Sequence, residues 1–242
     1  YLEAALISED PEIAERAARV AVSAGEWQMV ALASDRWAML DSTSLDAREL
    51  AAGSRLREGD YAGAEYQLER ILELTSTTPE LGWRVVIALL APVDDKSRAD
   101  KILNRLLEEF DGGSDVSALF ARSRLAASFG DLEEAFDLAD QAIKIEPKRA
   151  DILAWSGRLA VNLGNETLAI SRYQRAWEAD PENEQIAMSY AELLKRTNNL
   201  TAAQEVLAQL PDTPDMRFAR IIFALDGGDR DNAELLYTGF ST

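Results

Sequence analysis

The chain has 242 residues, of which 47% are hydrophobic and 28% are charged, a balance typical of a globular protein with a sizeable core. It contains neither cysteine nor histidine, which excludes disulfides, thiol nucleophiles, zinc sites built on these residues and Ser-His-Asp triads. Its net charge of −18 repels phosphate backbones and anionic lipid, so we expect this segment to bind no nucleic acid and to make no membrane contact.

A repeat organises the chain. Gly130 and Gly164 lie 34 positions apart, and the same offset carries Pro147 onto Pro181. Each repeat reads as an apolar helix, a turn with Gly or Asn, a second helix with small residues, and a proline before the next helix. In chain order we expect the repeats to begin near Pro11, Leu45, Glu80, Val116, Ala150, Glu184 and Pro214.

The turns inside the repeats follow one pattern, with a single exception. They are expected at Gly25, Gly59, Gly130, Gly164, Asn198 and Gly228. The repeat that begins near Glu80 has Pro92-Val93-Asp94-Asp95 at this place instead. Residues 1–4 match residues 173–176, which lie in a second helix, so we expect the chain to open inside a truncated repeat and to be a fragment of a longer protein.

Apolar residues recur at three- and four-residue steps, as at Ala135, Leu138 and Ala142, and no segment alternates with a period of two. One amphipathic helix pair cannot bury its apolar face alone, but stacked pairs can. The pattern therefore predicts an all-α solenoid. Helix starts are expected where a capping oxygen precedes a proline, at Asp10-Pro11, Thr78-Pro79, Asp180-Pro181 and Thr213-Pro214.

Gly157, Ala169, Tyr173, Ala176 and Pro181 stand at the spacing of a known signature, and over these residues the chain resembles the tetratricopeptide repeat family. The resemblance implies a right-handed superhelical solenoid of antiparallel helix pairs, with about seven repeats and the first truncated. It further implies a single domain over residues 1–242 that acts as a non-catalytic scaffold for a protein or peptide partner.

A second likeness concerns the N-terminal part. The stretch Asp10–Ala21, followed by Trp37 and the turn at Gly59, resembles tetratricopeptide lipoproteins of the proteobacterial outer membrane. Some of these resemble adaptors that hold a carboxyl-terminal processing protease. This resemblance implies a protease partner and a periplasmic location with a lipid anchor upstream of the segment. A cytoplasmic location is the alternative.

The family resemblance also implies which residues face the inner, concave side: positions 2, 5, 9, 12 and 13 of each first helix. In the six repeats from Pro11 to the one that starts near Glu184, this set is nearly neutral and rich in arginine, so the remaining surface is strongly acidic. The candidate partner-binding residues are Arg84, Phe120, Arg124, Arg158, Asn162, Met188 and Arg196. The alternative is that these arginines form solvated salt bridges with neighbouring carboxylates.

We expect no catalytic residue, no cofactor and no metal. Asp111–Asp115 and Asp226–Asp231 combine carboxylates with glycine, but neither has the spacing of a twelve-residue calcium loop, and helix capping explains both. Two other functions stay open. The segment could be the repeat arm of a larger enzyme, or a self-assembly module that associates through an open solenoid end.

Overall fold

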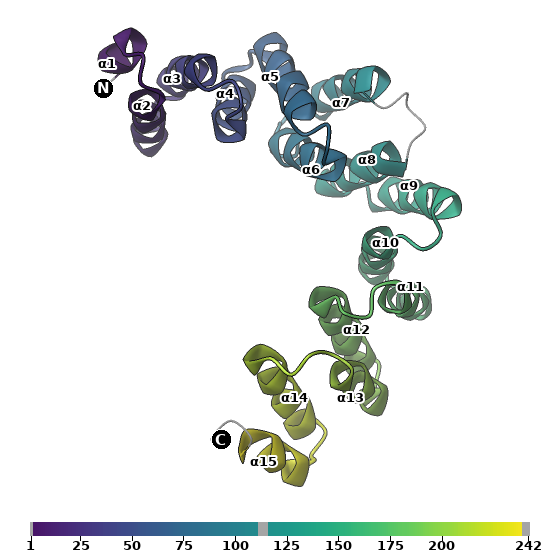
Figure 1. Cartoon of the computed structure of the whole chain (residues 1–242). Helices are drawn as coiled ribbons and strands as arrows, with labels where there is room; N and C mark the ends of the chain where they lie inside the picture. Colours follow the sequence, from purple (N-terminus) through teal and green to yellow (C-terminus); the bar gives the residue numbers. More distant parts are fainter. Residues whose placement is uncertain (1, 111–115, 239–242) are drawn as a thin grey trace. The chain divides into compact units, whose positions relative to one another are not determined.

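The computed structural model describes residues 2–110 and 116–238, and over these ranges every regular element is an α-helix (Figure 1). Contacts divide the chain into an N-terminal body, residues 1–131, and a C-terminal body, residues 132–242. Among the described helices none is long and apolar enough to cross a membrane. The predicted all-α class is confirmed.

The helices alternate between the two positions of a repeat. The first helices are α2 (Pro11–Ala24), α4 (Leu45–Glu58), α6 (Pro79–Leu90), α8 (Val116–Ser128), α10 (Ala150–Asn162), α12 (Glu184–Arg196) and α14 (Pro214–Asp226). The second helices are α1 (Leu2–Ile7), α3 (Trp27–Leu40), α5 (Tyr61–Leu74), α7 (Lys96–Phe110), α9 (Leu132–Ile145), α11 (Glu166–Ala179), α13 (Leu200–Ala208) and α15 (Arg230–Thr238). Six of the seven predicted repeat starts coincide with the first residue of a first helix. The exception is α6, which begins at Pro79, one residue earlier than predicted.

The N-terminal body has two layers of helices. Figure 1 shows α2, α4, α6 and α8 along one side of it and α3, α5 and α7 along the other. Helices within the first-helix layer also contact each other, as α6 does with both α4 and α8. The core of this body includes Leu68, Ile71 and Leu106, which are almost completely buried between α5, α6 and α7. Stacking of pairs therefore buries the apolar faces as predicted.

The C-terminal body repeats this arrangement. Consecutive helices from α9 to α15 pack against each other, and Figure 1 shows α10, α12 and α14 on one side with α11 and α13 on the other. Tyr173, Tyr190, Leu194 and Leu207 join α11, α12 and α13 in one core. We call the side formed by first helices the first-helix face of each body.

Small residues lie where helices cross. The alanines that mark the second helices are fully buried: Ala64, Ala99, Ala135, Ala169 and Ala203. A side chain this small lets two helix backbones approach closely, and no polar atom is left to satisfy. The regular recurrence of alanine in the sequence thus reports helix contact.

The six predicted Gly or Asn turns share one backbone conformation. Their φ angles are positive, between 73° and 85° for the five glycines and 64° for Asn198. Glycine adopts this left-handed conformation without steric cost, and asparagine tolerates it better than most residues. Within the described residues the repeat with Pro92-Val93-Asp94-Asp95 has no such residue. The predicted exception is confirmed.

Two of the four predicted Pro-linked helix caps form hydrogen bonds. The side chains of Asp10 and Thr213 accept from the backbone amides of Glu12 and Met216. The Thr78 side chain makes no capping bond, although Pro79 does begin α6.

The prediction at Asp180-Pro181 was wrong. The helix α12 begins at Glu184, and Asn183 caps it by accepting from the amide of Ile186. Asp180 instead ends α11 and accepts a hydrogen bond from the Asn183 side chain at 3.0 Å. Two capping residues stand three positions apart here, and packing of the repeat selects the later one.

Candidate functional site

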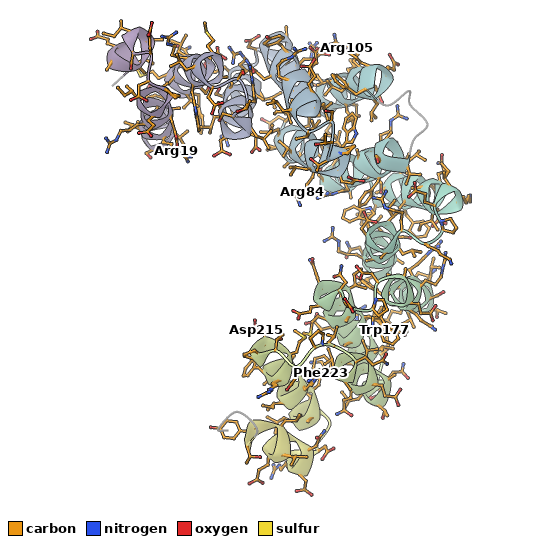
Figure 2. All side chains as sticks on the ribbon, viewed as in Figure 1. Arg19, Arg84, Arg105, Trp177, Asp215 and Phe223 are labelled. Carbon is orange, nitrogen blue, oxygen red and sulfur yellow. The ribbon has the colours of Figure 1, made fainter. Side chains whose placement is uncertain are left out.

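In the N-terminal body the predicted binding residues come from two adjacent first helices. Arg84 is exposed on α6 (Figure 2), and Phe120 and Arg124 are half-buried on α8, which packs against α6. The guanidinium carbon of Arg124 lies 5.8 Å from the centre of the Phe120 ring. The first-helix face of this body therefore presents two cations and an aromatic ring.

In the C-terminal body Arg158 is the most distinctive of the predicted residues. It is exposed on α10, and its guanidinium carbon lies 4.3 Å from the centre of the half-buried Trp155 ring. It has no ion-pair partner in the part of the chain that the structure describes. A guanidinium that rests on an indole keeps its donors directed outward, which suits a planar carboxylate.

Tyr173 of α11 is close enough to Arg158 for that charge to act on its phenol. Burial raises the pKa of its phenol, and the positive charge of Arg158 acts in the opposite direction. Ser189 of α12 acts in the same direction as Arg158. Tyr173 is 7% exposed, so it belongs to the core of this body.

The other predicted residues of this body differ in their surroundings. Asn162 is exposed at the end of α10. Met188 is half-buried on α12 and packs against the core, so part of its role is structural. Arg196 forms an ion pair of 3.6 Å with Glu166 of α11, and both side chains are about half exposed. The salt-bridge alternative therefore describes Arg196.

Arg19 is a second arginine of this salt-bridged kind (Figure 2). Its guanidinium lies 2.8 Å from Glu15 and 3.3 Å from Asp46. These contacts raise the pKa of Arg19, with the hydrogen bond to Glu15 as the largest cause. Because all three side chains are exposed, the pairs contribute about 0–1 kcal/mol to stability.

The six-repeat set left out the last repeat, and exposed side chains occupy its equivalent positions. Phe218, Ile222 and Leu225 of α14 stand at positions 5, 9 and 12, and they are 63%, 38% and 50% exposed. The signal was present in the sequence, since numbering the seventh repeat from Pro214 gives these residues directly. Trp155 was not among the predicted binding residues, although its ring lies against Arg158.

No group of three or more acidic residues in the described ranges is arranged to hold a metal ion. Two acidic segments were predicted to cap helices. In the segment Asp226–Asp231, Asp226 pairs with Lys195 at 2.9 Å, and Asp229 accepts a hydrogen bond from the backbone amide of Asn232 at the start of α15. The second such segment, residues 111–115, lies outside the described residues.

The comparisons with known proteins agree with this architecture. The family model described as tetratricopeptide repeat matches residues 164–221. A TPR repeat-containing protein of Dictyostelium discoideum is 29% identical over 108 residues, which are 40% of this chain and 41% of that protein. The chain thus spans less than half of the length of this curated relative.

Two solved structures show the same fold at low identity. PilF of Pseudomonas aeruginosa is 16% identical with a TM-score of 0.52, over 81% of this chain and 89% of PilF. Yeast Tom70 is 15% identical with a TM-score of 0.56, over 88% of this chain and 46% of Tom70.

The fold and its first-helix faces define a helical repeat scaffold. The family model and the relative from Dictyostelium discoideum show similarity to tetratricopeptide repeats, which the family model places at residues 164–221. Proteins of this family are generally non-catalytic scaffolds, and a scaffold of this kind indicates protein–protein interaction.

Proposed function

We propose that this chain binds a partner protein or peptide on its first-helix faces and catalyses no reaction. One observation carries the proposal: the exposed guanidinium of Arg158 rests on Trp155 and has no ion-pair partner among the described residues. An arginine in this state loses little on binding, because no internal pair has to be broken and the indole already limits its movement.

The N-terminal body supports the same proposal with similar chemistry. Arg84 is exposed on α6, and Arg124 lies beside the ring of Phe120 on the adjacent α8. Arginine and aromatic side chains are the residue types that contribute most at protein interfaces. We infer that carboxylates of the partner pair with these arginines while its apolar side chains contact the rings.

The test is affinity capture with the full-length protein from its own cells. Arg124→Glu combined with Arg158→Glu reverses one charge on each body, and we expect capture of the partner to be lost. Lys101→Glu combined with Lys144→Glu is the matched control, because it makes the same charge change at exposed sites on α7 and α9 in the second-helix layer. Equal capture by both double variants would refute the proposal.

The particular partner is also a proposal. We infer from the likeness over Asp10–Ala21 that the chain is an adaptor for a periplasmic protease, anchored to the outer membrane through an upstream lipid. From the 34-residue repeat we infer that residues 1–242 belong to a single repeat domain. Cell fractionation and identification of captured proteins test this. A cytoplasmic protein without a protease among its partners would remove the adaptor role and leave the scaffold role intact.

The acidic surface supplies a second test of binding. A net charge of −18 favours basic partner surfaces through faster encounter, so the association rate should fall as salt concentration rises. Stopped-flow association at low and high salt measures this effect.

A further inference from the structure

The first-helix face of the C-terminal body carries an apolar strip. We use this name for Phe218, Ile222 and Leu225 of α14 together with Met188, which holds the position of Phe218 in α12. The three α14 residues are spaced by four and three positions, so they lie on one side of the helix. Their exposures of 63%, 38% and 50% show that the folded chain leaves this side largely uncovered.

Met188 packs partly against the core, but the three α14 residues of the strip lie apart from it. The opposite side of α14 supplies the buried residues, among them Met216, Ala219 and Phe223, the last of which is labelled in Figure 2. Lys195 of α12 reaches across to α14, because it pairs with Asp226 at 2.9 Å and lies 4.7 Å from the centre of the Phe223 ring. Phe218, Ile222 and Leu225 are therefore not needed for the packing of this repeat.

The charges around the strip identify the chemistry of what covers it. The cations of the two helices that carry the strip are occupied: Lys195 pairs with Asp226, Arg196 pairs with Glu166, and both Arg217 and Arg220 pair with Asp212. Arg158, on the preceding first helix α10, has no ion-pair partner among the described residues. Carboxylates near it are available: Glu192 on α12 and Asp215 at the start of α14 are exposed (Figure 2) and have no ion-pair partner within residues 2–110 and 116–238. The strip is thus apolar with acidic neighbours.

We propose that the apolar strip receives an amphipathic segment of a partner protein, whose apolar side chains contact Phe218 and Ile222 and whose lysine or arginine side chains pair with Glu192 and Asp215. This inference rests on the proposed function and specifies the kind of segment that the C-terminal body binds. Exposed apolar side chains on a rigid helix are typical anchors for such a segment.

A second copy of this chain fits the strip poorly. Each copy carries a net charge of −18, so two copies repel each other. A stable interface also takes roughly 20–30 residues from each partner, far more than the strip contains. A basic segment, in contrast, gains from the charge and needs only a short contact.

The experiment uses fluorescein-labelled synthetic peptides of about 14 residues, one with leucines at helical spacing among lysines, one with glutamate for lysine, and one with serine for leucine. Fluorescence anisotropy measures their affinity for the purified chain. We expect only the Leu/Lys peptide to bind. Phe218→Ser with Ile222→Ser should weaken it by about tenfold or more, and Glu192→Lys with Asp215→Lys should also weaken it.

Leu235→Ser is the matched control, because Leu235 is 72% exposed on α15 outside the strip. This variant should bind the Leu/Lys peptide like the wild type. The inference is overturned if the Leu/Lys peptide still binds the Phe218→Ser and Ile222→Ser variant with wild-type affinity. It is also overturned if the Ser/Lys peptide binds the wild type as tightly as the Leu/Lys peptide does. A third outcome also overturns it: analytical ultracentrifugation shows a dimer of the wild type and a monomer of the Phe218→Ser and Ile222→Ser variant. A second copy of the chain would then occupy the strip.

Comparison with the arginine variants separates this inference from the proposed function. In one outcome the Arg124→Glu and Arg158→Glu double variant loses capture of the natural partner while the Phe218→Ser and Ile222→Ser variant retains it. That result refutes the inference alone. Capture that persists in both refutes the proposed function as well. Circular dichroism melts of each variant establish that loss of binding is not loss of folding.

Discussion

The ring of Tyr173 on α11 lies against Gly157 on α10, so that a β-carbon at residue 157 would stand only 2.8 Å from the Cδ2 atom of the ring. Both residues are buried, and the ring makes part of the core of the C-terminal body. The absence of a side chain at residue 157 therefore sets the distance between the two helices of this repeat.

Gly157→Ala should destabilise the protein. Alanine favours a helix over glycine by about 1 kcal/mol, but the displaced Tyr173 ring costs more, and we expect a net loss of about 1–3 kcal/mol. Urea unfolding followed by circular dichroism measures it. Asn162→Ala, an exposed change on the same helix, should alter stability by less than about 0.5 kcal/mol. A Gly157→Ala protein as stable as the wild type contradicts this explanation.

The turn residues should respond according to their φ angles. Gly164 has a φ of 77° with open space around the position of a β-carbon, so Gly164→Ala suffers only from backbone strain, about 1 kcal/mol. Gly164→Asn should cost less, and Asn198→Gly, at a φ of 64°, should be close to neutral. Thermal melts of the three variants give this order, and a destabilising Asn198→Gly would contradict it.

Local signals explain why the repeat boundaries could be predicted. A glycine or asparagine in the left-handed conformation follows every first helix except α6, so these turns can be recognised in the sequence. Buried alanines such as Ala135 and Ala169 recur for an equally local reason, the close approach of two backbones. The contact of Arg158 with Trp155 joins residues three apart on one helix and was also within reach of sequence reasoning.

Contacts between distant residues could not be predicted in this way. Asp35 on α3 accepts hydrogen bonds from Arg55 on α4 and from Gln67 on α5, which are 20 and 32 positions away. Polar residues at such separations carry no periodic signal. The same holds for the pairing state of the predicted arginines, because Arg196 finds Glu166 only through packing of α12 on α11.

Asp35→Asn should therefore destabilise the N-terminal body. It removes the charge that faces the Arg55 guanidinium, whose side chain is only 17% exposed, and leaves that cation with Asp60 at 3.3 Å. We expect a loss of about 1–3 kcal/mol in the free energy of unfolding. Asp46→Asn is the control, because its ion pair with Arg19 is exposed and should be worth about 0–1 kcal/mol. Equal losses for the two variants would show that burial of the pair has no effect.

Glu65 should make stability depend on pH. This residue of α5 is 8% exposed, and its Oε2 atom lies 2.8 Å from the Arg105 guanidinium of α7. Burial raises the pKa of its carboxyl above the usual 4.5; Arg105 opposes the shift, and Glu69 and Glu109 add to it. The folded state therefore binds the proton more tightly than the unfolded state. The stabilisation from this proton is complete below pH 4.5 and is lost as pH rises through the pKa of Glu65 in the folded state.

Glu65→Gln holds this side chain neutral at every pH, so its free energy of unfolding should improve relative to the wild type between about pH 4 and pH 7. The lost ion pair with Arg105 offsets little of this gain, because the Arg105 side chain is 63% exposed. Chemical unfolding at both pH values measures the difference. In an Arg105→Gln background the opposing cation is gone, so the change with pH should become steeper. A difference between Glu65→Gln and wild type that stays constant with pH, or that falls as pH rises, would mean that burial does not control this carboxyl.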